Sequence, residues 1–266
     1  MSSKFLISIA ALATVSGLAA SIAPAAPIFG GPTYDDTVGT GFLNPQLPWA
    51  PGGTAGNGTA VGYANKLKDG TNLGTRAVRW DASGTAATEL GNIGTSSNGV
   101  LNSYAYAVNA DGTAVGVAPK YTSGSFCGYR AVRWDASGTA ATELGNIGTT
   151  GSGFTESKAY AINAAGTAVG YANKHTGNTV IGVRAVRWDA SGTAATELGN
   201  IGTNSSGHTL SRAYAVNASG TAVGFAQKFS GDTSLGDRAL RWDASTAAAT
   251  ELGNIGASGT GVTNTY

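Results

Sequence analysis

The strongest constraint on the fold of this chain is an internal repeat with a period of 54 residues. Residues 76–95 recur without change at 130–149 and again at 184–203. The repeat divides residues 51–266 into four frames of equal length, which are 51–104, 105–158, 159–212 and 213–266. Repetition at such a period is typical of arrays in which each unit buries its apolar faces against its neighbours.

Each frame is predicted to form four short β-strands. Glycine recurs every few residues, and no apolar stripe of helical period extends beyond two turns, so helices are not expected. Ala110-Asp111-Gly112 suits a three-residue hairpin loop, whose last position favours glycine. We expect Ala136-Ser137-Gly138 to form the same kind of loop. The four strands of the second frame are predicted over 104–109, 113–121, 130–135 and 139–144.

The predicted loop length decides which side chains share a face of the sheet. In the first frame it pairs Trp80 with Ala86 and places Leu90 on the Trp80 face, so the core is expected there. Arg79 and Glu89 then lie diagonally on the opposite face, within reach of one another. Such an exposed ion pair contributes about 0–1 kcal/mol. The repeated core residues are Trp80, Trp134, Trp188 and Trp242, and the predicted ion pairs are Arg79–Glu89, Arg133–Glu143, Arg187–Glu197 and Arg241–Glu251.

These patterns favour an all-β fold, specifically a β-propeller-like array of four four-stranded antiparallel repeats. A β-solenoid or an open repeat array is the alternative, although solenoid coils are usually shorter. The first frame begins with the sequence Pro-Gly-Gly-Thr-Ala at 51–55, which is unsuited to an ordinary strand. We therefore expect the lead-in segment 27–50 to supply a substitute strand, anchored by Trp49 and Phe42.

The first 26 residues are predicted to be a secretory signal peptide. Lys4 gives a positive start, residues 5–20 are apolar with small side chains, and Ala23-Pro24-Ala25 offers a cleavage site. The apolar stretch contains several Ser and Thr residues, whereas a membrane span needs about 20 strongly apolar ones. The mature chain is expected to be secreted, to the extracellular space or the periplasm, and to have no membrane span after signal cleavage.

Composition argues against several kinds of partner and cofactor. Charged residues make up 12% of the chain and nearly cancel, at a net charge of +1, so a nucleic-acid partner is not expected. The single cysteine, Cys127, excludes an internal disulfide framework. His175 and His208 lie in different variable loops of the frame 159–212, without metal-ligand spacing. Asn109-Ala110-Asp111-Gly112 resembles a calcium loop, but its acid is not repeated, so no metal or other cofactor is expected.

No catalytic constellation is apparent in the sequence. Carboxylate catalysis needs two acids in different environments, whereas every frame repeats the same pair, such as Asp81 and Glu89. No nucleophile motif of the Ser/His/Asp kind is present. We therefore predict a binding or surface-structural module without enzymatic activity. The alternatives are a secreted enzyme acting on glycans, with carboxylates of different frames facing one another in a channel, or a partial repeat protein without independent activity.

Differences between the frames concentrate in two segments. The first set is 67–75, 121–129, 175–183 and 229–237, and the second is 95–104, 149–158, 203–212 and 257–266. Constant strands with variable loops are typical of recognition scaffolds, although drift in tolerant loops would produce the same pattern. The predicted ligand is an extracellular glycan or protein. The residues expected to face it, by stacking on a sugar or a peptide, are Leu67, Tyr121, His175 and Phe229.

Two motifs follow one another in every frame. They are Arg76-Ala77-Val78-Arg79-Trp80-Asp81 with Leu90-Gly91-Asn92-Ile93-Gly94, and the segment from Ala105 to Gly116. Over residues 60–256 the chain resembles the HAF-repeat family of extracellular bacterial proteins, although the His-Ala-Phe of that family is Arg-Ala-Val or Arg-Ala-Leu here. The resemblance implies secretion and a repeated β fold, and it supplies no catalytic residues. The WD40 repeat, which shares the Trp-Asp pair, has a shorter period of about 40–45 residues and a Gly-His partner motif.

Overall fold

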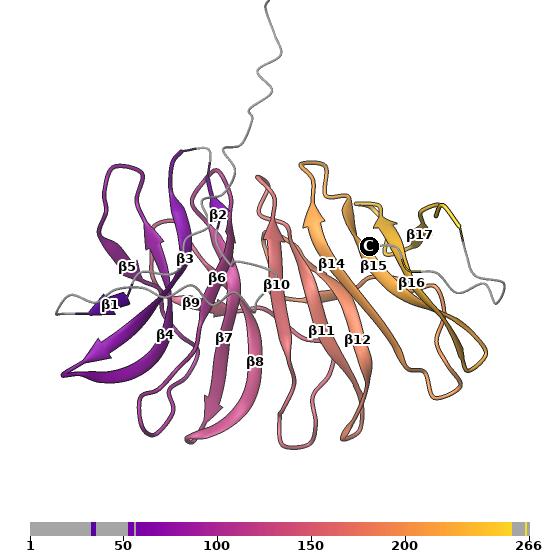
Figure 1. Ribbon diagram of the computed structural model, residues 1–266, viewed down its shortest axis with the longest axis horizontal. Helices are drawn as coiled ribbons and strands as arrows, with labels where there is room; N and C mark the ends of the chain where they lie inside the picture. The colour runs from indigo at the N-terminus through magenta and orange to yellow at the C-terminus, as the bar shows by residue number, and fades with distance from the viewer. Residues whose placement is uncertain (1–32, 36–52, 56, 257–263, 265–266) are drawn as a thin grey trace, which may run out of the picture.

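The computed structural model describes residues 33–35, 53–55, 57–256 and 264. These residues form an all-β structure without helices, and the strands make several sheets (Figure 1). The first sheet contains β1 (Thr33–Asp35), β2 (Gly53–Thr54), β3 (Ala60–Lys68), β4 (Thr71–Trp80) and β5 (Ala87–Glu89). The second contains β6 (Tyr104–Val108), β7 (Ala114–Thr122), β8 (Ser125–Trp134) and β9 (Ala141–Glu143).

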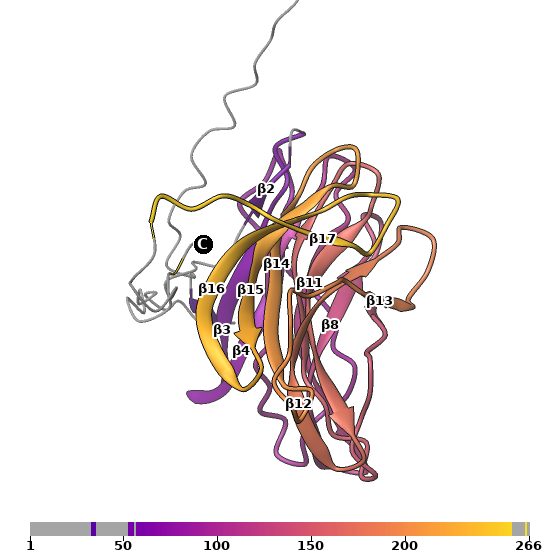
Figure 2. The same ribbon diagram turned by 90° about the vertical axis from the view of Figure 1, so that its right-hand side faces the viewer.

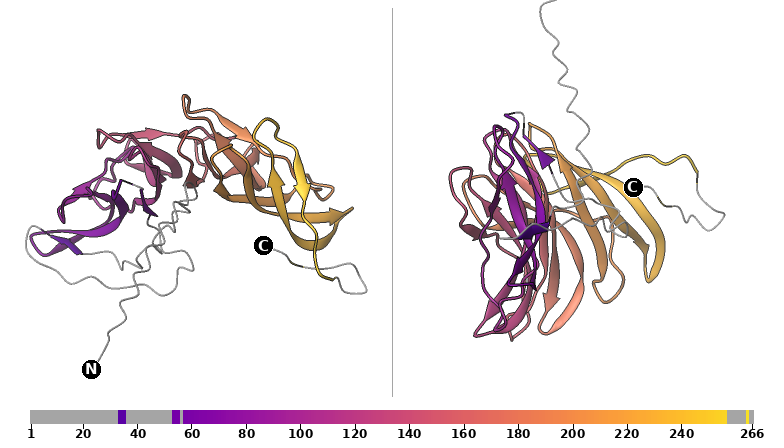
Figure 3. Two further views of the ribbon diagram at one scale, coloured as in Figure 1. Left: turned by 90° about the horizontal axis from the view of Figure 1, so that it is seen from above. Right: turned by 60° about the vertical axis from the view of Figure 1, so that its left-hand side comes forward.

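The third sheet joins the strands of two frames. It contains β10 (Ser157–Ile162), β11 (Ala168–Thr176), β12 (Thr179–Trp188), β13 (Ala195–Glu197), β14 (Thr209–Val216), β15 (Ala222–Ser230), β16 (Thr233–Trp242) and β17 (Ala249–Glu251). The connection is a short parallel pairing of Gly182 and Val183 with Thr209 and Leu210. Along the described residues the sheets follow one another on an arc whose ends do not meet (Figure 3), so no closed barrel or propeller forms.

The first frame has a shortened first strand, as its sequence suggested. β2 pairs antiparallel with β3 over only Gly53 and Thr54. β1, from the lead-in segment, pairs parallel with β3 at Asn65–Leu67. Trp49 and Phe42 lie outside the described residues.

The second and third strands of each frame form a longer hairpin than predicted. β7 and β8 continue to a two-residue turn at Ser123 and Gly124, both of which have positive φ. In the third frame the turn between β11 and β12 instead begins with a glycine, Gly177, as in type II′ turns. The prediction that the second and third strands end at 121 and begin at 130 is therefore wrong. This variable segment is the end of a β-hairpin, as are its counterparts 67–75, 175–183 and 229–237.

One of the two predicted hairpin loops is confirmed and the other is wrong. Asn109 N donates to Thr113 O across a three-residue loop, and Gly112 has a φ of 90°. The loop after Trp80 is longer, because Trp80 pairs with Ala87 and not with Ala86. This shift of one residue moves Leu90 to the face opposite Trp80. Leu90 N accordingly donates to Ala77 O.

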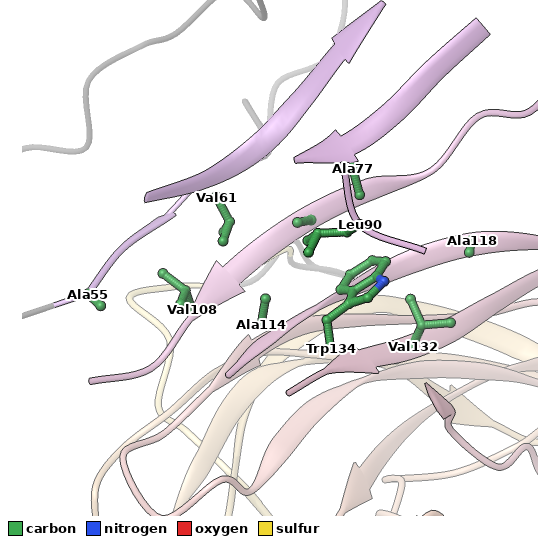
Figure 4. Packing of buried hydrophobic residues seen from close by; sticks show 10 residues of the cluster. Ala55, Val61, Ala77, Leu90, Val108, Ala114, Ala118, Val132 and Trp134 are labelled. Carbon is green, nitrogen blue, oxygen red and sulfur yellow. The ribbon is translucent and has the colours of Figure 1, made fainter. Parts of the chain in front are cut away.

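The corrected register gives each frame two distinct apolar faces. We call the one that carries Val78 and Trp80 the Trp face, and the one that carries Val61, Ala77 and Leu90 the Leu face. The Leu face of the first frame packs on the Trp face of the second, where Val108, Ala114, Val132 and Trp134 surround it (Figure 4). The same contact recurs between the second and third frames and between the third and fourth. The core is therefore a series of equivalent interfaces between successive frames.

Gly182 is predicted to be essential to the parallel link between β12 and β14. Its φ is 122°, and a Cβ there would lie 2.0 Å from Thr209 O. Gly182→Ala should therefore lower the denaturant midpoint more than Gly177→Ala, because a Cβ at Gly177 meets nothing within 4 Å. For Gly177→Ala we expect only the backbone strain of about 1–2 kcal/mol. Equal midpoints for the two variants would contradict this role of Gly182.

Candidate functional site

The repeated glutamates are held by cations of their own frame. Glu89 accepts from Lys66 Nζ at 2.7 Å and lies 3.2 Å from Arg76 Nε. The predicted pairing of Glu89 with Arg79 is wrong, because the shifted register puts the two residues on opposite faces. The same correction applies to Arg133–Glu143, Arg187–Glu197 and Arg241–Glu251, whose glutamates pair instead with Lys120 and Arg130, Lys174 and Arg184, and Lys228 and Arg238.

Arg76 and its counterparts anchor the chain where one frame leads into the next. The Arg130 guanidinium is buried and donates to the carbonyl oxygens of Cys127, Gly153 and Thr155. Burial lowers the pKa of Arg130, and the Glu143 carboxylate opposes this shift. Each of these arginines and its glutamate is therefore engaged in holding the fold.

A second set of arginines crosses to the following frame. Arg79 Nη1 donates to Ala136 O at 2.6 Å, and its Nη2 donates to Asp135 O at 2.8 Å. Arg133 and Arg187 make the equivalent bonds to the carbonyl oxygens of Ala190 and Ala244. These side chains hold adjacent frames together across the Leu and Trp faces.

The acidic residues do not gather into one centre within the part of the chain that is described. There, no group of three or more His, Cys, Asp and Glu side chains is placed to hold a metal ion. Asn109 Oδ1 accepts from the backbone N–H groups of Asp111 and Thr113, so this side-chain oxygen closes the turn that resembled a calcium loop.

The two variable segments of the sequence lie together at one edge of the array. Gly151 N donates to Asn178 Oδ1, and Ser205 N donates to Asp232 Oδ1, both at 2.7 Å. Each bond joins the second variable segment of one frame to the hairpin end of the next. The hairpin ends of β7–β8, β11–β12 and β15–β16 point toward the lower edge in Figure 1. We call this edge, formed by residues 67–75, 95–104, 121–129, 149–158, 175–183, 203–212 and 229–237, the variable rim.

The four residues predicted to face a ligand are half-buried in strands of this rim, and three of them contact the preceding frame. A Cβ at Gly94 would lie 2.7 Å from Tyr121 N, and Gly148 and Gly202 approach His175 and Phe229 in the same way. His175 Nε2 lies 3.1 Å from Thr155 Oγ1, and burial together with the Arg130 cation lowers the pKa of His175. Leu67 pairs with Asp35 and Asn72. These positions therefore contribute to the joints between strands and frames.

Sequence reasoning missed the most exposed aromatic residue of the rim, Phe126. Its side chain is 44% exposed, and its ring lies 5.6 Å from that of Tyr121, 5.4 Å from Tyr129 and 6.1 Å from Phe154. We call these four residues the rim aromatic cluster. Had β8 been extended to residue 125, strand alternation would have identified Phe126 as the cross-strand partner of Tyr121.

A second aromatic feature also escaped sequence reasoning. Tyr106, Tyr160 and Tyr214 recur at the repeat period, and Tyr160 lies 5.8 Å from Tyr106 and 5.5 Å from Tyr214 between ring centroids. A register shift between Ala105 and Ala107 displaces Tyr106 from the regular alternation of the strand. Burial raises the pKa of Tyr106, as do the neighbouring tyrosines. The row packs the first strands of successive frames together.

No protein-family model matches the chain, and no curated protein matches its sequence. Within the described ranges, no helix is long and apolar enough to cross a membrane. The predicted signal peptide, residues 1–26, lies outside those ranges.

Proposed function

We propose that this chain is a secreted binding module without catalytic activity, built from propeller-like frames of four strands. The observation that carries the proposal is the variable rim, where the two segments that differ between the frames meet at one edge. The strands and arginine anchors behind the rim are nearly constant, so a common scaffold presents different side chains from each frame.

The ligand class follows from the rim aromatic cluster. The Phe126 ring packs against three further aromatic rings and is nearly half exposed. Such a ring can stack against the apolar face of a sugar or against an aromatic side chain of a peptide. The proposed partner is therefore an extracellular glycan or protein. The predicted signal peptide and the resemblance to the HAF-repeat family support a location outside the cytoplasm.

The test is a glycan and peptide array probed with the purified mature chain, followed by affinity measurements on the strongest ligand. Phe126→Ser should weaken that affinity by about tenfold or more, because exposed aromatic anchors often dominate binding energy. Serine is compatible with the hairpin, since Ser234 occupies the same position in the fourth frame.

Val180→Ser is the matched control, because Val180 occupies the Phe126 position in the third frame and is 45% exposed. It should weaken the affinity less than Phe126→Ser does, because valine has no ring to stack on the ligand. An array without any bound ligand would overturn the proposed function, and equal losses for the two variants would overturn the role of Phe126.

A further inference from the structure

The Leu face of the fourth frame lacks the cover that the other three Leu faces have within the described residues. Val61, Val115 and Val169 are buried against the next frame, whereas Val223, at the same position, is 41% exposed. Leu252 is only half-buried and Ile255 is fully exposed, although the corresponding residues of the earlier frames pack in the core. Figure 2 turns this end of the array, with β15, β16 and β17, toward the viewer.

Polar groups on the same face also lack, among the described residues, the partners that their counterparts have in the next frame. Arg241 pairs with Asp243 at 3.2 Å and its side chain is 47% exposed, whereas Arg79 donates to two carbonyl oxygens of the next frame. Asn109 and Asn163 donate across to the next frame, while Asn217 is exposed. A Cβ at Gly253 would meet nothing within 4 Å, although at Gly91 it would lie 2.7 Å from Thr139 O of the next frame. The face therefore has both the apolar and the polar elements of an interface that it does not make with any described residue.

The surface that fits this face is a Trp face, since three such pairs already form within the chain. Trp134, Trp188 and Trp242 are fully buried, and each Nε1 donates at 2.8 Å to a glycine carbonyl oxygen of the preceding frame. Trp80, on the Trp face of the first frame, is only half-buried. Among the described residues, one molecule thus has a half-buried tryptophan at one end and, at the other, a Leu face without a following frame against it.

We propose that the Leu face of the fourth frame binds the Trp80 face of a second copy of this chain. The contact repeats the internal interface, so the Trp80 indole of one copy donates to Gly253 O of the other, and Arg241 donates to the carbonyl oxygens of Asp81 and Ala82. Because the two surfaces differ, association is head-to-tail and extends the arc of the array, closing into a ring if the curvature permits. This proposal is independent of ligand binding at the variable rim.

The test measures the molar mass of the purified chain by light scattering over a series of concentrations. The mass of the unmodified chain should rise with concentration. Val223→Lys should raise the dissociation constant at least about tenfold, because it places a charge in an apolar contact. Val180→Lys is the matched control, since Val180 is equally exposed but lies on the variable rim, and it should associate like the unmodified chain.

A mixing experiment then tests the direction of association. Val223→Lys blocks the Leu face and leaves the Trp80 face intact, whereas Trp80→Ala removes the opposite partner. Each variant should be monomeric alone, and an equimolar mixture should form a heterodimer that grows no further. A mass of the unmodified chain that stays monomeric at all concentrations would overturn the proposal. Association that survives Val223→Lys unchanged would overturn it too, even if Trp80→Ala fails to fold.

Discussion

Replacing Arg130 with methionine should lower the free energy of unfolding by about 3–5 kcal/mol, because each hydrogen bond of a charged group contributes about 1.5–3 kcal/mol. The Arg130 side chain is 2% exposed, lies 3.2 Å from Glu143 and donates to three backbone carbonyl oxygens at the junction of two frames. Methionine fills a similar volume but removes the guanidinium donor from these three oxygens, of which Cys127 O still accepts from Thr155 N. Urea denaturation followed by circular dichroism would measure the loss.

The matched control is Lys120→Met, which removes the other cation bound to Glu143. The Lys120 side chain is 34% exposed, so we expect this variant to lose no more than about 1 kcal/mol. If the two variants lost the same stability, the carbonyl network of Arg130 would contribute nothing beyond its ion pair.

Trp188→Ala should cost about 3–5 kcal/mol, as is usual for truncation of a large buried aromatic residue. The Trp188 side chain is fully buried between the second and third frames, and its Nε1 donates to Gly145 O. The variant loses this hydrogen bond and leaves a cavity in the interface. Neighbouring units of a repeat array stabilise one another. We therefore expect the denaturation midpoint to fall for the adjacent frames as well as for the third.

Trp80→Ala provides the comparison at an equivalent sequence position. Trp80 is only half-buried, so at a concentration where the chain is monomeric its truncation should cost clearly less than that of Trp188. Equal losses at the two positions would contradict the inference that the interfaces between frames, and not the frames themselves, bury the tryptophans.

Sequence alone was sufficient for the strand content and for one class of turn. The period and the alternation placed β6 and β7, and Asn109 with Gly112 specified the loop between them. The loop after Trp80 was mispredicted because its glycine, Gly84, suggested a tight turn, whereas the structure pairs Trp80 with Ala87. In a β-sheet an error of one residue reverses both faces, so the partners of Arg79 and Glu89 were wrong as well.

The candidate site could be predicted only in part from the sequence, for a different reason. Comparison of the frames located the variable segments. That these segments lie at one edge depends on contacts between frames, such as the bond from Gly151 N to Asn178 Oδ1. No local pattern specifies such contacts, because they depend on how one frame stacks on the next. Tyr121, which was predicted to face a ligand, is half-buried on the rim, whereas its exposed partner Phe126 lies in a part of the hairpin that the sequence did not predict.

The measurement that tests the central claim most directly is hydrogen exchange of the tryptophan indole N–H groups, followed by NMR and assigned with single Trp→Phe variants. The central claim is that the Leu face of one frame packs against the Trp face of the next. It predicts slow exchange for Trp134, Trp188 and Trp242, since each indole N–H is bonded to a carbonyl oxygen of the preceding frame inside the interface. Exchange of these three groups at the rate of a solvent-exposed indole would contradict the stacked arrangement.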